Sequence, residues 1–189
     1  MKKKSIVIIA VIAVIVILIG SLIGSYNGLI ESREAVSQSQ SEISNQLQRR
    51  ADLIPNFVST VKGYSDYEKE TYTAVTEARK AVANADSVGE QANASAQLDS
   101  AIDIWVNAVT EAYPDLKANQ NYIALQDELS GTENRIAVAR RDYNKSAKEY
   151  NVKIKKFPRS LLAGIFGFQS FEYFEADSNA QNVPQVSFD

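Results

Sequence analysis

Few residue types in this chain are suited to catalysis. Its 189 residues include no histidine and no cysteine, so the commonest general base and the best nucleophile are missing. A serine–lysine pair is chemically possible, but no serine lies on a tight glycine-flanked turn beside a lysine. Without cysteine there is no disulfide, thiolate metal site or lipoprotein anchor. We therefore expect no enzyme activity and no catalytic residue.

Two carboxylates, Glu68 and Glu133, are expected on inward faces of helices. Ferritin-like bundles bind two irons through glutamates and Glu-x-x-His pairs on facing helices, and this chain lacks the histidines. Glutamates alone can bind a hard cation, but carboxylates beside arginines usually pair with those arginines. We expect no metal and no cofactor.

Polar residues fall on or next to the apolar seams of the predicted helices. They are Arg33, Gln40, Glu68, Glu133, Asn134 and Arg140. They could form a recognition network, or a structural lattice of buried ion pairs and amide hydrogen bonds that determines which helices pair. We favour the lattice. We likewise interpret Tyr143 and Tyr150 as core rather than a ligand site, and Arg49 and Arg50 as basic residues at a helix end.

An apolar segment near the N-terminus predicts a membrane anchor. Residues 5–24 carry no charge and follow Lys2, Lys3 and Lys4. About 20 helical residues cross a bilayer core. The segment exceeds the roughly 7 to 15 residues of a signal-peptide core, and no Ala-x-Ala-like cleavage site follows it. We expect an uncleaved span that contacts the lipid bilayer through residues 5–24.

The charge distribution predicts the orientation of this span. Three lysines precede it, the first basic residue after it is Arg33, and the positive flank stays cytoplasmic. We expect a single-pass protein of the inner membrane with its C-terminal domain outside the cytoplasm. A basic group at 153–159 that returned to the membrane in the fold would weaken this prediction. Without the three lysines, 17 basic and 23 acidic residues give a formal charge of −6, which makes nucleic acid an unsuitable partner.

The segment after the span reads as helical from Tyr26 to Phe157, because good helix formers dominate and no strand-like alternation occurs. Leu29, Val36 and Ile43 form a heptad seam. A turn at 49–55 is preferred, with Asp52 as N-cap of a second helix over 53–83 and Pro55 in its first turn. One long helix kinked at Pro55 is the alternative.

Two further helices are expected after a turn at 84–89. The first carries Leu98, Ile102, Trp105, Val109 and Ala112 and ends at Tyr113 before Pro114. The second shows an unbroken interval of seven, which predicts supercoiled, coiled-coil packing. That seam is Tyr122, Leu129, Ile136, Tyr143, Tyr150 and Phe157, with companions Leu125, Thr132, Ala139 and Ser146.

These elements predict an all-α fold: one transmembrane helix, then an antiparallel up-and-down four-helix bundle with long helices. The expected organisation is a basic flank (1–4), the span (5–24), the bundle (26–157), an aromatic-rich segment (158–175) and a loose C-terminus (176–189). The segment 158–174 has two interpretations. It either contacts the membrane surface or folds back to close the end of the bundle.

The chain resembles the LemA family of bacterial membrane proteins. The longer matching runs are Tyr26-Asn27-Gly28-Leu29, Gln46-Leu47-Gln48-Arg49-Arg50-Ala51-Asp52-Leu53-Ile54-Pro55-Asn56, Val61-Lys62-Gly63-Tyr64, Tyr113-Pro114-Asp115-Leu116-Lys117-Ala118 and Thr132-Glu133-Asn134-Arg135-Ile136-Ala137. The shorter ones are Leu125-Gln126, Ala139-Arg140, Tyr143-Asn144, Tyr150-Asn151, Phe157-Pro158, Gly167-Phe168 and Tyr173-Phe174. One departure is Tyr67, where the family often carries a histidine.

The resemblance implies one N-terminal span, a four-helix bundle and no established activity. Family members look like envelope proteins sometimes associated with membrane proteases. We expect a non-catalytic scaffold or adaptor of the bacterial envelope that binds other envelope proteins. The alternative is a ligand-sensing or transport-accessory domain that binds a small molecule or lipid within the bundle. An apolar cavity of a few hundred Å³ favours the second, and a solid core with an exposed apolar patch favours the first.

Overall fold

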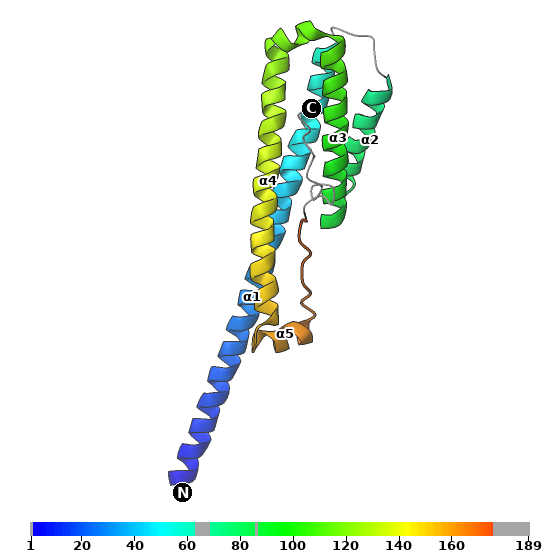
Figure 1. The fold of residues 1–189 in the computed structure, drawn as a ribbon. Coiled ribbons are helices and arrows are strands. Elements are labelled where there is room, and N and C mark those ends of the chain that lie inside the picture. The colour runs from blue at the N-terminus through cyan, green and yellow to red at the C-terminus, as the bar shows by residue number, and fades with distance from the viewer. Residues whose placement is uncertain (1, 63–68, 86, 176–189) are drawn as a thin grey trace, which may run out of the picture. The chain divides into compact units, whose positions relative to one another are not determined.

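The computed structural model describes residues 2–62, 69–85 and 87–175. These residues contain helices and no strand, which confirms the all-α prediction (Figure 1). The chain divides into two compact units, one made of residues 1–39 and 143–171 and the other of 40–142 and 172–189. Helices α1 (Lys2–Lys62) and α4 (Gln120–Lys155) each contribute to both units.

Helix α1 continues from the apolar segment into the packed part of the chain without a break. The predicted turn at 49–55 is therefore wrong, because Pro55 lies inside α1. Proline in a helix interior costs about 3 kcal/mol. Pro55 itself is exposed, whereas Ile54, Phe57 and Val58 are buried. We attribute the unbroken helix to this buried face, since burying each large apolar side chain contributes about 1.5 to 3 kcal/mol.

In the first unit, α1 packs against α4 along the predicted heptads. Leu29 and Val36 of α1 and Tyr143, Ala147 and Tyr150 of α4 are all at most 1% exposed. Two polar contacts give the direction of the pair. Ser39 Oγ lies 3.2 Å from Ser146 Oγ, and Lys153 Nζ lies 2.6 Å from Ser32 Oγ. Seven residues back along α1 thus correspond to seven forward along α4, so these two segments run antiparallel.

Helix α5 (Arg159–Phe166) follows α4 in the same unit. The sixth and last position of the long seam, Phe157, was expected in the core and is 81% exposed instead. The reason is that α4 ends at Lys155, earlier than the predicted end of the bundle at residue 157, since the residue before Pro158 is driven out of helical geometry. Gly167 ends α5 with a φ of 71°, a left-handed conformation that favours glycine. The chain then runs without regular structure to residue 175.

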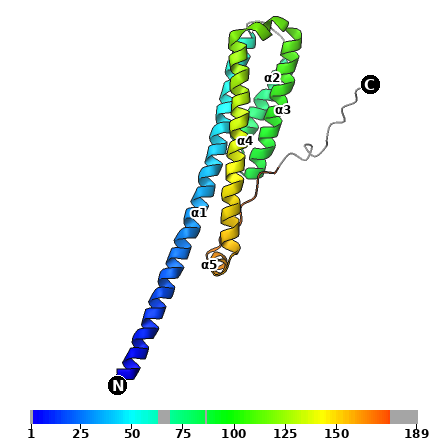
Figure 2. The same ribbon diagram turned by 60° about the vertical axis from the view of Figure 1, so that its left-hand side comes forward.

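The second unit contains α2 (Lys69–Ala83), α3 (Val88–Ala112) and the 3-10 helix η1 (Pro114–Ala118), together with parts of α1 and α4 (Figure 2). Helix α3 begins with a capping box, in which Ser87 accepts from the Glu90 N–H and Glu90 accepts from the Ser87 N–H. The Asn119 side chain accepts from the N–H groups of Asn121 and Tyr122 and so caps the start of α4.

The core of the second unit centres on the single tryptophan. The Trp105 ring of α3 lies 4.9 Å from that of Phe57 on α1, and the Phe57 ring lies 5.1 Å from that of Tyr122 on α4. Helix α2 packs on α3, with Val75, Ala78 and Val82 buried. The predicted seam of α3 is confirmed at four positions, while its fifth residue, Ala112, is exposed. Residues Tyr64 and Glu68 of the expected second helix lie outside the described residues.

Candidate functional site

The most deeply buried charge in the second unit belongs to Arg50. Its side chain is 3% exposed, and its Nη1 atom lies 2.7 Å from Oδ1 of Asp99 on α3. The two atoms form an ion pair and no hydrogen bond. Glu133 on α4 lies farther away, at 4.0 Å from Nη2, and its side chain is 67% exposed. Arg50 therefore links α1 to α3 firmly and to α4 only weakly.

Burial is the largest influence on the pKa values of Asp99 and Arg140. It raises the pKa of Asp99, and the nearby guanidinium groups of Arg50 and Arg140 only partly oppose this effect. Burial also lowers the pKa of Arg140, with Asp99 opposing. An arginine remains charged at neutral pH. Arg50 and Arg140 thus provide positive charge beside Asp99, while Glu133 and Asp103 add negative charge near it. This arrangement is typical of a structural ion-pair cluster.

Polar residues follow one buried line on α3. Gln91, Ser95 and Asp99 are spaced by four and so share a face. Gln91 is 6% exposed and Ser95 is 0% exposed, and Gln91 Nε2 donates to Ser44 Oγ of α1 at 3.2 Å. Sequence reasoning missed this line. The sequence contained the information, because these polar residues recur every four positions next to the apolar residues Leu98 and Ile102.

The structure places the predicted polar residues differently from expectation. Arg33, Glu133 and Asn134 are exposed, Gln40 and Arg140 are half-buried, and Glu68 lies outside the described residues. The lattice interpretation therefore applies to Arg140 and, through its 4.0 Å contact with the buried Arg50, in part to Glu133. It does not describe Arg33 and Asn134, and the closest pair is formed by Arg50 and Asp99. Arg50 was wrongly interpreted as a helix-end residue. Because α1 continues past it, Arg50 lies mid-helix on the buried face.

Other ion pairs lie near the surface. Glu128 Oε1 accepts from Arg49 Nη2 and from Arg135 Nη2, both at 2.8 Å. Asp52 lies 3.4 Å from Arg79 and is not an N-cap, because no helix begins there. Exposed pairs of this kind contribute at most about 1 kcal/mol each. They support helix pairing and suggest no chemistry.

A groove lies between α2 and α3. Its volume is about 510 Å³. Its lining residues are Ala74, Glu77, Ala78, Ala96, Gln97, Ser100, Ala101 and Ile104. Most of them are exposed or half-buried, and Ile104 is 61% exposed. The groove is thus an open, largely apolar surface feature.

Tyr143 and Tyr150 were interpreted as core rather than as a ligand site. Both side chains are at most 1% exposed, so they fill the core.

Carboxylates do not gather into a metal site in the part of the chain that the structure describes, where no three Asp or Glu side chains come together in a geometry for an ion.

The N-terminal part of α1 has the properties of a membrane span. Among the described residues, this is the one helix that is long and apolar enough to cross a bilayer, with a mean hydropathy of 3.5 in its most apolar stretch. Its side chains from residue 4 to residue 24 are exposed throughout. The fold and this surface define an all-α protein with a candidate N-terminal membrane anchor.

The LemA family model matches residues 39–188, and the chain belongs to the LemA family. A protein LemA from Metamycoplasma hominis is 28% identical over 155 residues, which cover 82% of this chain and 70% of the relative. Magnetosome protein MamQ 2 from Paramagnetospirillum magneticum is 26% identical over 208 residues, covering 97% and 76%. Magnetosome protein MamQ from Magnetospirillum gryphiswaldense is 26% identical over 198 residues, covering 92% and 72%.

Proposed function

We propose that this protein is a membrane-anchored, non-catalytic scaffold or adaptor of the bacterial envelope, with residues 26–157 arranged as an antiparallel four-helix bundle. The observation that carries the proposal is the continuity of α1. Exposed apolar residues up to Ile23 lead, on the same helix, to Leu29, which is 0% exposed. No flexible linker separates the anchor from the packed segment, so the domain is held at the membrane surface.

The ion pair between Arg50 and Asp99 supports a non-catalytic role. The buried Arg50–Asp99 pair is balanced in charge and connects helices, as a structural pair does. Two relatives are named as magnetosome proteins. By analogy, we propose that this chain also contributes to an assembled structure, although fold and family do not themselves define function.

The proposed orientation has the N-terminus in the cytoplasm and the domain outside it. Lys2, Lys3 and Lys4 lie directly before the span. The basic group at 153–159 lies far beyond it in sequence, and the fold brings it back, since Lys153 contacts Ser32. That return weakens the charge asymmetry, and the proposal rests on the three lysines that adjoin the span along the chain. Orientation follows the basic residues within about 15 to 20 residues of the span. Protease added to cells with a permeabilised outer membrane should degrade the domain. Protection until the inner membrane is lysed would overturn this orientation.

The adaptor role is tested by crosslinking in living cells. A photo-crosslinking residue at Ile104, in the groove of α2 and α3, should give one discrete adduct with an envelope protein. The matched position is Ile123 on α4, which is also exposed but lies outside the groove. Equal yields at the two positions, or adducts with many unrelated proteins, would contradict specific binding at the groove.

The second candidate function is binding of a small molecule or lipid, which the volume of the same groove favours. Replacing Ala101 by Trp would fill the groove. If the function is ligand binding, this variant should lose a ligand that co-purifies with the wild-type chain while its protein adduct at Ile104 persists. If the Ala101→Trp variant instead loses the protein adduct and no bound ligand, the result supports the adaptor function.

A further inference from the structure

Helix α5 and the short connection between α4 and α5 expose a set of large apolar side chains. They are Phe157 (81%), Leu161 (60%), Ile165 (75%) and Phe166 (57%), which we name the α5 face. On the other side of α5, Leu162 and Ala163 are buried. A contiguous exposed apolar surface of this kind marks a site of contact with a membrane or another protein.

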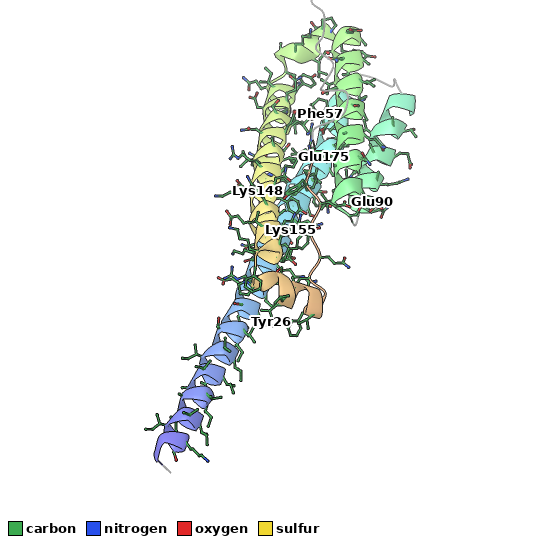
Figure 3. All side chains as sticks on the ribbon, turned by 60° about the horizontal axis from the view of Figure 1, so that its bottom comes forward. Tyr26, Phe57, Glu90, Lys148, Lys155 and Glu175 are labelled. Carbon is green, nitrogen blue, oxygen red and sulfur yellow. The ribbon has the colours of Figure 1, made fainter. Side chains whose placement is uncertain are left out.

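The α5 face lies where the apolar segment of α1 ends. The Phe166 ring is 4.8 Å from the ring of Tyr26, and the Phe168 ring is 5.8 Å from it. Tyr26 comes two residues after Gly24, or about 3 Å along the helix axis. Figure 3 shows Tyr26 on α1 beside α5. The polar layer on each side of a bilayer core is about 5 to 7 Å thick, so Tyr26 and Phe166 fall within it when the span is inserted.

The charges around this face favour an anionic surface. Between Glu149 and Glu172 the chain has no acidic residue, and it carries Lys153, Lys155, Lys156 and Arg159. Lys155 and Lys156 are exposed, whereas Lys153 donates to Ser32. Exposed lysines next to exposed aromatic and aliphatic side chains are the combination that binds the headgroup region of anionic membranes.

The α5 face is also held in place before any contact with lipid. Asn151 of α4 makes two hydrogen bonds with the backbone of Phe171: its Nδ2 donates to the carbonyl at 2.8 Å, and its Oδ1 accepts from the N–H at 2.9 Å. The Phe171 ring lies 5.2 Å from that of Tyr150. These contacts fasten the segment after α5 to α4, so little conformational entropy would be lost when the face meets a membrane.

From these observations we propose that the α5 face is a second, peripheral membrane contact that enters the headgroup–acyl boundary of the anionic bilayer in which the protein's own span is inserted. This inference rests on the proposed function, because it requires an inserted span. The two interpretations of the segment 158–174 then both hold in part. Phe166 and Phe168 contact Tyr26 of α1, and Phe171 contacts α4. The exposed part of the α5 face contacts lipid.

The chain has no cysteine, so a single introduced cysteine carries a spin label at one known place. The full chain is reconstituted in vesicles of phosphatidylglycerol and phosphatidylcholine with one label at Ile17, Ile165 or Val152. Collision with oxygen, which concentrates in hydrocarbon, is compared with collision with a water-soluble nickel chelate. Val152 is the control because its neighbour Lys153 contacts Ser32, eight residues or about 12 Å beyond Gly24.

The expected ratio of oxygen to nickel accessibility is highest at Ile17, intermediate at Ile165 and lowest at Val152, with a several-fold difference between Ile165 and Val152. Equal ratios at Ile165 and Val152, with Ile17 in lipid, would overturn the membrane contact and leave the anchor intact. Low accessibility of Ile165 to both reagents would mean burial against protein and would also overturn it. A water-exposed Ile17 would overturn both the anchor and this inference.

The charge contribution is tested separately. The double variant Lys155→Gln and Lys156→Gln should lower the oxygen-to-nickel ratio at Ile165 in anionic vesicles and change it little in vesicles of phosphatidylcholine alone. The matched control is Lys148→Gln, an exposed lysine further back along α4. An equal effect of the control, or an equal effect in both kinds of vesicle, would refute electrostatic attraction to the lipid.

Discussion

Arg50 Nη1 of α1 lies 2.7 Å from Asp99 Oδ1 of α3, and the guanidinium is almost completely removed from solvent. A buried ion pair is weak evidence for net stability, because desolvation offsets the attraction between the charges. Breaking such a pair is different, since it leaves one charge buried without a counterion. The pair is therefore best tested by removing one partner at a time.

Asp99→Ala should destabilise the protein by about 3 kcal/mol, at the low end of the range for a broken buried pair because Asp99 is itself 33% exposed. Asp99→Asn retains an oxygen that can face Arg50 and should cost less. Chemical denaturation of the full chain in detergent micelles, followed by circular dichroism, measures both. Glu133→Ala is the matched control and should change stability by less than about 1 kcal/mol, since its carboxylate is exposed. Equal losses for Asp99→Ala and Glu133→Ala would show that Asp99 is not the principal partner.

The raised pKa of Asp99 predicts a pH dependence of stability. In the folded protein this carboxyl binds its proton up to a higher pH than the ordinary value of 3.8. Between 3.8 and the raised value, the native state thus holds more protons than the unfolded state, and the contribution of Asp99 to stability falls as pH rises. Compared with Asp99→Asn, the wild type should therefore gain stability as pH is lowered towards 3.8. A relative loss on acidification would mean that attraction to Arg50 and Arg140 exceeds the effect of burial.

Asn151→Ala should release the segment after α5. The variant leaves the N–H and carbonyl of Phe171 without their side-chain partners, and an unsatisfied polar group costs about 1 to 3 kcal/mol. We expect faster amide hydrogen exchange and faster proteolysis around residues 167–175, with little change in α1. Asn134→Ala, at an exposed position of the same helix, should change neither rate. Unchanged exchange in Asn151→Ala would show that other contacts hold this segment.

Phe57→Ala should destabilise the second unit by about 3 to 5 kcal/mol, because it removes a ring that is 1% exposed and packs on both Trp105 and Tyr122. The chain has one tryptophan, which is 4% exposed. Its fluorescence therefore reports on this core directly, and the emission should shift to longer wavelength in the variant. Phe57→Leu keeps most of the apolar volume and should show a smaller shift.

Pro55→Ala should stabilise the protein, by at most about 3 kcal/mol, because an alanine at this position restores a backbone N–H and the helical propensity that proline lacks. Pro55 is exposed inside α1, so little packing is lost. Thermal unfolding measures the gain. A loss of stability would show that the local geometry imposed by Pro55 is required for packing in the second unit.

Several features of the fold were predictable from spacing alone. The heptads of Leu29 and Val36, and of Tyr143 and Tyr150, correctly predicted buried faces, because a helix brings every seventh residue back to nearly the same side. The end of α3 ahead of Pro114 followed from steric exclusion. Local rules then failed at Pro55 and Phe157. At Pro55, burial of neighbouring side chains outweighed the local helix-breaking tendency. At Phe157, the helix had already ended, so the seven-residue interval no longer described a face.

The apolar segment at 5–24, the all-α class and the lack of histidine and cysteine can be read directly from the chain, because they depend on composition and on the period of apolar residues. The close pairing of Arg50 with Asp99 rather than Glu133, and the contact of α5 with Tyr26, became visible only in the packed helices. Electrostatic attraction falls with distance and with exposure to water. The residues that meet in space, and the side chains that lose contact with water, are properties of the packed helices together.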